Sequence, residues 1–98
     1  MKARSRPTKE AAEMLAIQAL AFISEDPDRL GGFLSVTGLT IEGIRDAARQ
    51  SGFLSGVLDH MLGNESLLMA FADSAALDPA DVARARGALG GEWHRDSP

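Results

Sequence analysis

The sequence predicts an all-α fold, a compact bundle of five or six short helices. Ala and Leu, both strong helix formers, dominate a chain of 98 residues whose hydrophobic fraction is 45%. β-branched residues, which favour strands, are sparse. Apolar residues recur at helical spacing between Asp-Pro and glycine signals that begin and end helices. A chain of this length can form one domain with its own core.

We predict a disordered basic arm over residues 1–7, a single helical domain over residues 8–91 and a flexible tail over residues 92–98. The first nine residues hold four basic residues and no acidic one, so with a net charge of −4 the remainder sums to −8. An acidic body with a basic arm differs from a general nucleic-acid binder, which needs a basic face on its folded domain.

The first three helices are predicted from their caps. The first should begin after Thr8 and end near Ser24, and its apolar residues cover so wide an arc that much of it should be buried. The second should begin at Asp26-Pro27, a cap followed by proline at the first helical position, and end at Gly38. Thr40 should cap the third helix, whose apolar stripe is narrow.

The stretch Phe53–Leu77 is the densest apolar run and is predicted to form a central helical hairpin. Ser51 should cap the fourth helix, which has the clearest helical periodicity in the chain. Asn64 should cap the fifth, in which every residue from Leu67 through Ala72 is apolar. A helix that is hydrophobic nearly all round is expected at the centre of a fold.

Two further signals bear on the fold. Asp78-Pro79 should begin a sixth helix that ends at Gly90-Gly91. Gly31-Gly32 lies inside the second helix, where each glycine costs about 1 kcal/mol relative to Ala. Close approach of another helix would explain this pair of glycines. Sequence drift that the fold tolerates would explain it equally well.

The chain also aligns with itself at an offset of thirty-eight residues, which places Asp26 on Asn64. At this offset, predicted helix caps align with other predicted helix caps, and apolar core positions align with other apolar core positions. This pattern predicts two three-helix half-repeats that share one core, over residues 8–50 and 51–91. Chance similarity between two leucine-rich helical hairpins is the alternative explanation.

No group of residues predicts catalysis, and we expect neither an enzyme nor a cofactor or metal site. The chain has no cysteine, which excludes disulfides, thiolate catalysis and cysteine-ligated zinc. His60 is expected to be a solvated surface residue, because the positions three and four residues away hold no usual metal ligand. Glu25, Asp26 and Asp28 are three acids in four residues, but Asp26 is better explained as a helix cap.

The leading functional hypothesis is a non-enzymatic cytoplasmic protein that acts through protein–protein contact or self-association. The lack of cysteine and of any membrane-length apolar run fits this class. Trp93 in the tail could anchor a partner or fold back onto the core. The residues expected to make contacts are Lys2, Arg4, Arg6, Arg45, Arg49 and Trp93. An enzyme or small-ligand binder with a pocket between the two half-repeats is the weakest alternative.

The sharper alternative is a nucleic-acid-associated protein that uses the basic arm and a helix-turn-helix-like pair over residues 28–50. However, Glu42 and Asp46 offset Arg45 and Arg49 on the second helix of this pair. Phosphate contact requires net positive charge, so this near-neutral face argues against binding.

Four segments follow one another in an order that is not generic helical sequence: AIQALAFISEDPDRLGGFL (16–34), TGL (37–39), FLSGVLDHMLGNESLLMAF (53–71) and ALDPADVARAR (76–86). With them the chain resembles a family of short, uncharacterised alphaproteobacterial proteins, domain of unknown function 3572. The resemblance covers most of residues 12–90 and excludes the tail from Glu92. It implies a small cytoplasmic all-helical protein with no assigned activity and no catalytic residues to transfer. Gly31-Gly32 and Gly43 depart from the pattern, since helix formers would be expected there.

Overall fold

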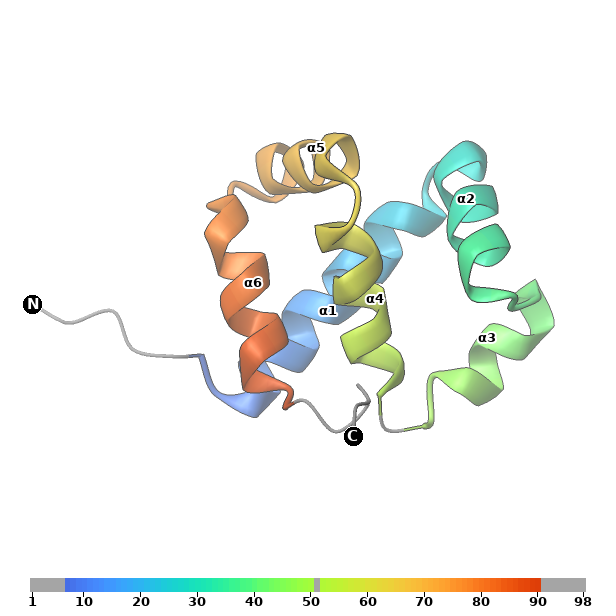
Figure 1. The fold of residues 1–98 in the computed structure, drawn as a ribbon, viewed down its shortest axis with the longest axis horizontal. Coiled ribbons are helices and arrows are strands. Elements are labelled where there is room, and N and C mark those ends of the chain that lie inside the picture. The colour runs from blue at the N-terminus through green and yellow to red at the C-terminus, as the bar shows by residue number, and fades with distance from the viewer. Residues whose placement is uncertain (1–6, 51, 91–98) are drawn as a thin grey trace, which may run out of the picture.

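The computed structural model describes residues 7–50 and 52–90, and six α-helices account for most of them. They are α1 (Lys9–Ser24), α2 (Pro27–Thr37), α3 (Ile41–Ala47), α4 (Phe53–Leu62), α5 (Glu65–Ala75) and α6 (Pro79–Ala88), as Figure 1 shows. These residues contain no strand, so the all-α prediction is confirmed. The predicted basic arm, the Ser51 cap and the predicted tail lie wholly or almost wholly outside the described residues.

Side-chain caps begin most of the helices at the predicted residues. The Thr8 hydroxyl accepts from the Ala11 N–H at 3.0 Å, and the Asn64 side-chain oxygen accepts from the Leu67 N–H at 3.1 Å. Caps of the same kind lie at Asp26, Thr40 and Asp78. Each cap satisfies a backbone N–H that has no partner within its helix.

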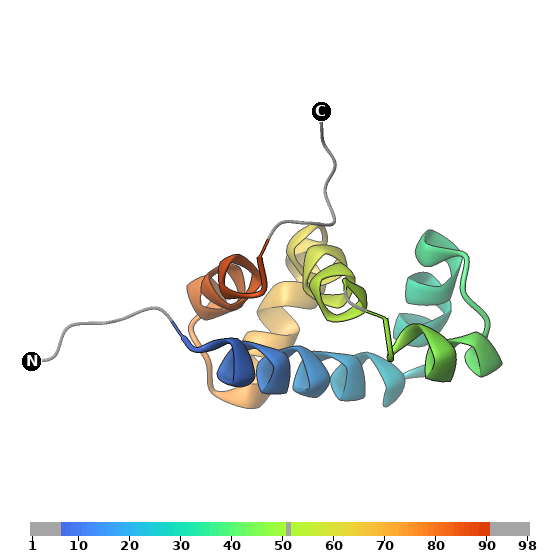
Figure 2. The same cartoon turned by 90° about the horizontal axis from the view of Figure 1, so that it is seen from below.

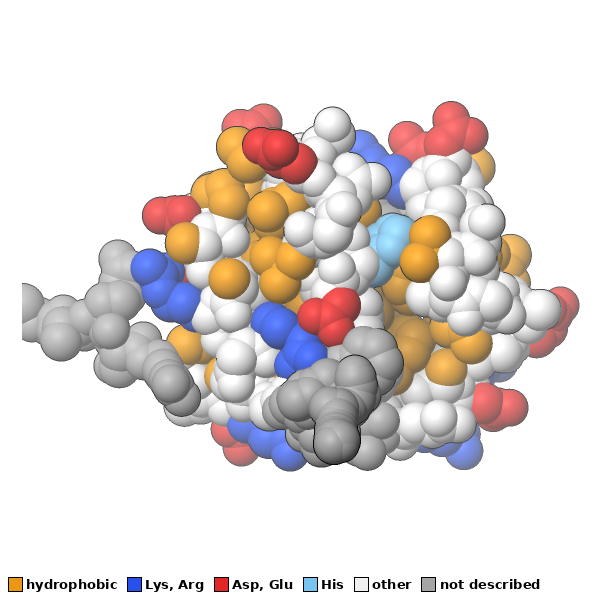
Figure 3. Space-filling model, in the orientation of Figure 1, with side chains coloured by type: hydrophobic (Ala, Val, Ile, Leu, Met, Phe, Trp, Pro, Cys, Tyr) orange, Lys and Arg blue, Asp and Glu red, His pale blue; other side chains and the backbone are white. Residues whose placement is uncertain are grey.

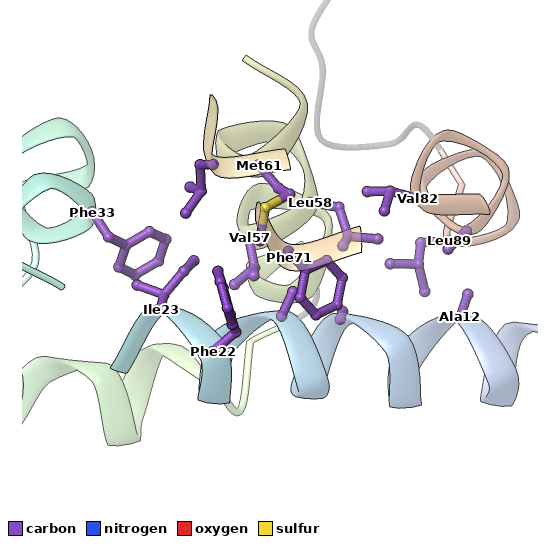
Figure 4. Close-up of a cluster of buried hydrophobic side chains, with 14 residues drawn as sticks. Ala12, Phe22, Ile23, Phe33, Val57, Leu58, Met61, Phe71, Val82 and Leu89 are labelled. Atoms are coloured by element: carbon purple, nitrogen blue, oxygen red, sulfur yellow. The ribbon is translucent and has the colours of Figure 1, made fainter. Parts of the chain in front are cut away.

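The centre of the core lies between α1, α4 and α6, each of which packs against the other two. In Figure 2, α1 forms one layer, and α4 and α6 lie side by side on it. Figure 4 shows Val57, Leu58 and Met61 of α4 directed into the space between these helices, with Val82 of α6 beside them. These four side chains are fully buried.

The predicted central hairpin is therefore half wrong: α4 is central, but α5 is not. α5 packs on α4 and α6 at the edge of the core, and its Met69 is 50% exposed. The central place belongs to α1, where Ala12, Ala16 and Ala19 are fully buried. These small side chains form a flat face on which two helices can approach closely, so burial here follows from shape and not from hydrophobicity alone.

The prediction that much of α1 is buried is only partly correct. Met14 is 66% exposed and Ile17 is 54% exposed, both on the face of α1 that points away from α4 and α6. Because α1 forms the outer layer, its second face has no helix to cover it among the described residues.

The two predicted half-repeats share one core, but they are packed differently. In the second half α4, α5 and α6 each pack against the other two. In the first half α2 packs on α1, while α3 makes only slight contact with any helix of the described chain. The similarity therefore extends to helix order and caps and not to tertiary packing.

The pair α2 and α3, residues 27–47, forms an arm at one end of the molecule (Figure 1). Two residues of α2 attach this arm to α1. Phe33 is 1% exposed and reaches toward Ile23 (Figure 4). The Arg29 guanidinium lies 3.9 Å from the centre of the Phe22 ring and donates a hydrogen bond of 3.3 Å to the Phe22 carbonyl.

Gly31 and Gly32 do not mark a close helix approach. A Cβ built on either residue would meet no atom within 4 Å, and both residues are exposed. Of the two explanations that the sequence allowed, close packing is wrong for the described part of the structure.

Candidate functional site

An open groove of about 610 Å³ separates the α2–α3 arm from α4. We define this arm groove by Phe33, Val36 and Thr37 of α2 together with Phe53, Asp59 and His60 of α4. Its lining is mainly apolar, and its volume is within the usual range for sites that bind small molecules or single large side chains. Figure 3 shows the histidine side chain in the hollow between the two parts, with hydrophobic side chains near it.

The turn between α2 and α3 shapes this groove. The Thr37 hydroxyl donates to the Phe33 carbonyl at 2.8 Å and accepts from the Leu39 N–H at 3.3 Å, which fixes the last turn of α2. Gly38 follows with φ of 76°, a left-handed conformation that glycine adopts at little cost. The chain consequently turns away from α1, and Leu39 and Ala47 close the groove on its α3 side.

Aromatic rings from both walls meet inside the groove. The Phe33 and Phe53 rings are 6.5 Å apart at an interplanar angle of 86°. The His60 ring also packs against Phe33, with the ring centres 5.2 Å apart at an interplanar angle of 83°. Edge-to-face arrangements of this kind stabilise aromatic pairs beyond the area that they bury. Phe33 therefore anchors the arm and also forms the base of the groove.

The prediction that His60 is a solvated surface residue is wrong. His60 is half-buried against α2, a contact twenty-seven residues away in the sequence that helical periodicity could not reveal. Burial lowers the pKa of His60 below its usual value, because desolvation disfavours the charged imidazolium. The lowered pKa favours the neutral ring, which has one N–H donor and one nitrogen acceptor.

Asp59 connects the groove to the end of α6. One of its carboxylate oxygens accepts from Arg86 Nε at 2.7 Å, and the Arg86 side chain is only 16% exposed. The same guanidinium donates through a second nitrogen to the Gly90 carbonyl. The charge of Asp59 is therefore balanced, and the last described residue of the chain lies close to the groove.

A second hollow of about 420 Å³ lies on the α5 side of the contact between α2 and α4. Val36 and His60 line both hollows, so the two form neighbouring parts of one apolar surface. Val36 is 74% exposed, the highest value for a large hydrophobic residue in the described chain. Its side chain therefore presents apolar surface to solvent where the two hollows adjoin.

Of the predicted contact residues, only Arg45 and Arg49 lie among the described residues, and neither lines the arm groove. Arg45 and Arg49 are exposed on and just after α3, and Arg49 borders a separate hollow of about 260 Å³. Trp93 and the three basic residues of the arm (Lys2, Arg4 and Arg6) lie outside the described residues. The residues that sequence reasoning missed are Phe33, Val36, Phe53 and His60. Only Val36 gave a signal in the sequence, because it is apolar but lies outside the i, i+3, i+4, i+7 positions of the second helix, which are Leu30, Phe33, Leu34 and Thr37.

The groove offers apolar contact and a few hydrogen bonds. The Thr37 hydroxyl and the Asp59 carboxylate are already hydrogen-bonded within the protein. No three His, Cys, Asp or Glu side chains in the described ranges are close enough together to hold a metal ion. None of the helices in those ranges has both the length and the hydrophobicity to cross a bilayer.

Fold and groove together define the class: a small all-α protein with an open, mainly apolar groove beside a loosely packed helix pair. The chain belongs to the family described as "Protein of unknown function (DUF3572)", whose model matches residues 9–92. The resemblance noted in the sequence is thereby confirmed, and the match extends as far as Glu92. No curated protein and no solved structure matches the chain significantly.

Proposed function

We propose that this is a non-enzymatic cytoplasmic protein of bacterial type that acts by protein–protein contact, with the arm groove as its contact site. The observation that supports this proposal is the groove itself, with two aromatic rings at its base and the 74% exposed Val36 on its rim. Contact sites typically place a buried aromatic or aliphatic anchor of the partner in such a hollow. The absence of cysteine fits a reducing compartment.

The shape of the groove favours a protein segment over a small metabolite. It is open along one side and adjoins the second hollow past Val36 and His60, so an extended or helical segment could lie across both. A small-ligand site, by contrast, usually encloses most of its ligand and presents several convergent polar groups. In this groove two of the polar side chains already bond within the protein.

Site-specific photo-crosslinking in cells tests this proposal. A photoreactive phenylalanine analogue is placed at Val36, in the groove, and in a matched protein at Met69, which is 50% exposed on α5 outside it. We expect a discrete protein adduct from position 36 and not from position 69. An adduct with the mass of two chains would identify self-association. The same adducts from both positions, or none from position 36, would contradict the proposal.

Nucleic-acid association is the competing proposal, and the observation in its favour is the helix pair α2–α3 with its tight turn at Gly38. α3 is only seven residues long and carries two acids beside Arg45. A titration of labelled duplex DNA at low and moderate salt separates the two proposals, since phosphate contacts weaken steeply with salt. Lack of binding at low salt would remove this alternative.

A further inference from the structure

A small hollow of about 260 Å³ lies where the link between α3 and α4 meets the first turns of α1. We call it the link hollow. Its polar lining comprises Lys9 and Glu13 of α1, Arg49 and Gln50 of the link, and Ser55 of α4. Figure 1 shows that α1 and α4 begin at the same side of the molecule, the lower side in that view. The link hollow therefore differs from the arm groove, whose lining is mainly apolar.

Ser55 is the only buried polar residue of the described chain, with an exposure of 4%. Its hydroxyl has no hydrogen-bond partner among residues 7–50 and 52–90. A buried hydroxyl without a partner costs free energy, so such groups are normally bonded to protein, water or a bound ligand. Because Ser55 lines the link hollow, a group that occupies this hollow can supply the missing bond.

The first turn of α4 also lacks partners. Of the six helices, α4 alone begins without a cap from a side chain of the described residues, because its N-cap is Gly52. Within the same ranges the backbone N–H groups of Leu54 and Ser55 have no acceptor, and both residues line the link hollow. Free N–H groups at the positive end of a helix dipole attract an anion.

Two positive side chains border the same hollow. Lys9 and Arg49 are exposed, and neither side chain forms an ion pair or hydrogen bond within residues 7–50 and 52–90. Arg84 and Arg86, by contrast, each pair with an aspartate. A guanidinium can bind two oxygen atoms of one anion, and a lysine adds a mobile point charge. The donors of the link hollow therefore suit an oxyanion.

Glu13 narrows the choice of oxyanion. It is the one acid in the lining, so two cations and one carboxylate give the hollow a net charge of +1. A carboxylate only accepts hydrogen bonds, so it repels sulfate but can accept from a phosphate that keeps an O–H. A phosphate monoester loses this proton above a pKa of about 6, whereas inorganic phosphate still carries one at pH 7. The lining therefore favours inorganic phosphate.

We propose that the link hollow binds inorganic phosphate, held by the first turn of α4, the Ser55 hydroxyl, Lys9 and Arg49. Its volume is below the usual range for sites of drug-sized ligands, which fits a single tetrahedral ion with some water. The bound ion joins α1, the α3–α4 link and α4. This site is separate from the arm groove, so the proposal does not depend on the proposed function.

An NMR titration of the full chain with inorganic phosphate tests the site. The titration is run at pH 7 and constant ionic strength, with chloride as the balancing anion. We expect the amide signals of Leu54 and Ser55 to shift and to saturate. Sulfate and methyl phosphate should bind severalfold more weakly. No saturable shift at these amides, or equal binding of sulfate, methyl phosphate and inorganic phosphate, would overturn the proposal.

Arg49→Gln and Arg45→Gln separate a local site from a general charge effect. Each removes one positive charge from an exposed residue, but only Arg49 lines the link hollow. We expect Arg49→Gln to weaken phosphate binding by about three- to tenfold, the usual size for one hydrogen bond to a charged group. Arg45→Gln should leave it nearly unchanged. Equal affinities in the two variants would overturn the proposal.

Ser55→Ala separates a ligand contact from a structural role. Without phosphate the variant should be as stable as the parent, because the hydroxyl that it removes has no partner within the described ranges. Phosphate should bind it severalfold more weakly. Unchanged phosphate affinity would overturn the proposal, whatever the stability of the variant.

Glu13→Gln tests the preference for phosphate over sulfate. The amide side chain carries no charge and can donate as well as accept, so sulfate should bind this variant nearly as well as phosphate. Glu10→Gln removes an exposed acid of α1 that does not line the link hollow and should keep the preference. A Glu13→Gln variant that still rejects sulfate would overturn the assignment of the ligand.

Discussion

The α2–α3 arm and the centre formed by α1, α4 and α6 lie next to each other but bury very different amounts of side chain. α4 alone buries four residues, whereas α2 buries one and α3 buries none. The centre is held from several sides, and the arm is held mainly through Phe33 and Arg29. The difference explains the groove: a helix pair that is attached along one edge leaves its other edge, with Val36, open to solvent and separated from α4 by the groove.

Substitutions in the core should have the largest effect on stability. Phe71→Ala is expected to lower the free energy of unfolding by about 3–5 kcal/mol, and Leu58→Ala by about 2–5 kcal/mol, since both side chains are buried and leave cavities. Urea denaturation measures both values. Ile41→Ala on α3 is the control; Ile41 is 64% exposed, and the expected change is within about 0.5 kcal/mol. A neutral result for Phe71 or Leu58 would contradict the described core.

Phe33→Ala sharpens the comparison, because Phe33 and Phe71 are the same residue type and equally buried, at 1% and 2% exposure. Once Phe33 is truncated, the arm can detach while the centre stays folded. The loss in global stability is then limited to the free energy that docks the arm. We expect a smaller decrease than for Phe71→Ala, together with loss of amide protection confined to residues 27–47. Equal decreases and uniform loss of protection would show that arm and centre unfold as one unit.

The helix boundaries could be predicted from the sequence because caps are local. Asp26 and Asn64 bond to N–H groups two or three residues away, and such spacing is visible in a single chain. The sequence also predicted α4 correctly, since its periodicity matches its burial.

The identity of the central helices could not be predicted from hydrophobicity alone. α5 is richer in large apolar residues than the alanine face of α1, yet α1 is central because its small side chains let two helices approach. The groove could not be predicted from the sequence for a similar reason. The contact between His60 and Phe33 depends on where α2 lies relative to α4 in the tertiary structure, which no local sequence pattern records.

Glycine substitutions should have a smaller effect that again separates the two regions. Gly31→Ala in α2 and Gly56→Ala in α4 both add a methyl group with no atom within 4 Å. Each should raise the free energy of unfolding by about 0.5–1 kcal/mol, because alanine loses less conformational entropy in a helix. In hydrogen exchange, Gly31→Ala should slow the amides of the arm, while Gly56→Ala should leave them unchanged. Slower arm exchange in both variants would argue against independent opening.

The smallest expected effect is a pH dependence at the boundary between the regions. The pKa of His60 is lower in the folded state than in the unfolded state, so the unfolded chain takes up the proton first as the pH falls. The stabilisation is therefore complete above about pH 6.5 and is lost as the pH falls through the folded pKa. The charged residues that line a hollow together with His60 are Asp59 on α4, and Asp28 and Arg29 across the second hollow.

Comparison with His60→Gln isolates this effect from the carboxylates, which titrate at lower pH. Denaturation curves at about pH 7.5 and pH 5.5 should show a greater loss of stability on acidification in the parent chain than in the variant. If the variant loses as much stability as the parent, burial of His60 against α2 does not perturb its titration.

Residue-resolved hydrogen exchange of the native protein tests the central claim most directly. If the arm is held at one edge, the amides of α3 should exchange through an opening that costs clearly less free energy than global unfolding. The amides of Val57, Leu58 and Met61 in α4 should exchange only when the whole protein unfolds. The same opening free energy for α3 and α4 would contradict the account, because a rigidly packed arm would leave the groove a fixed surface feature and not the open edge of a loosely attached helix pair.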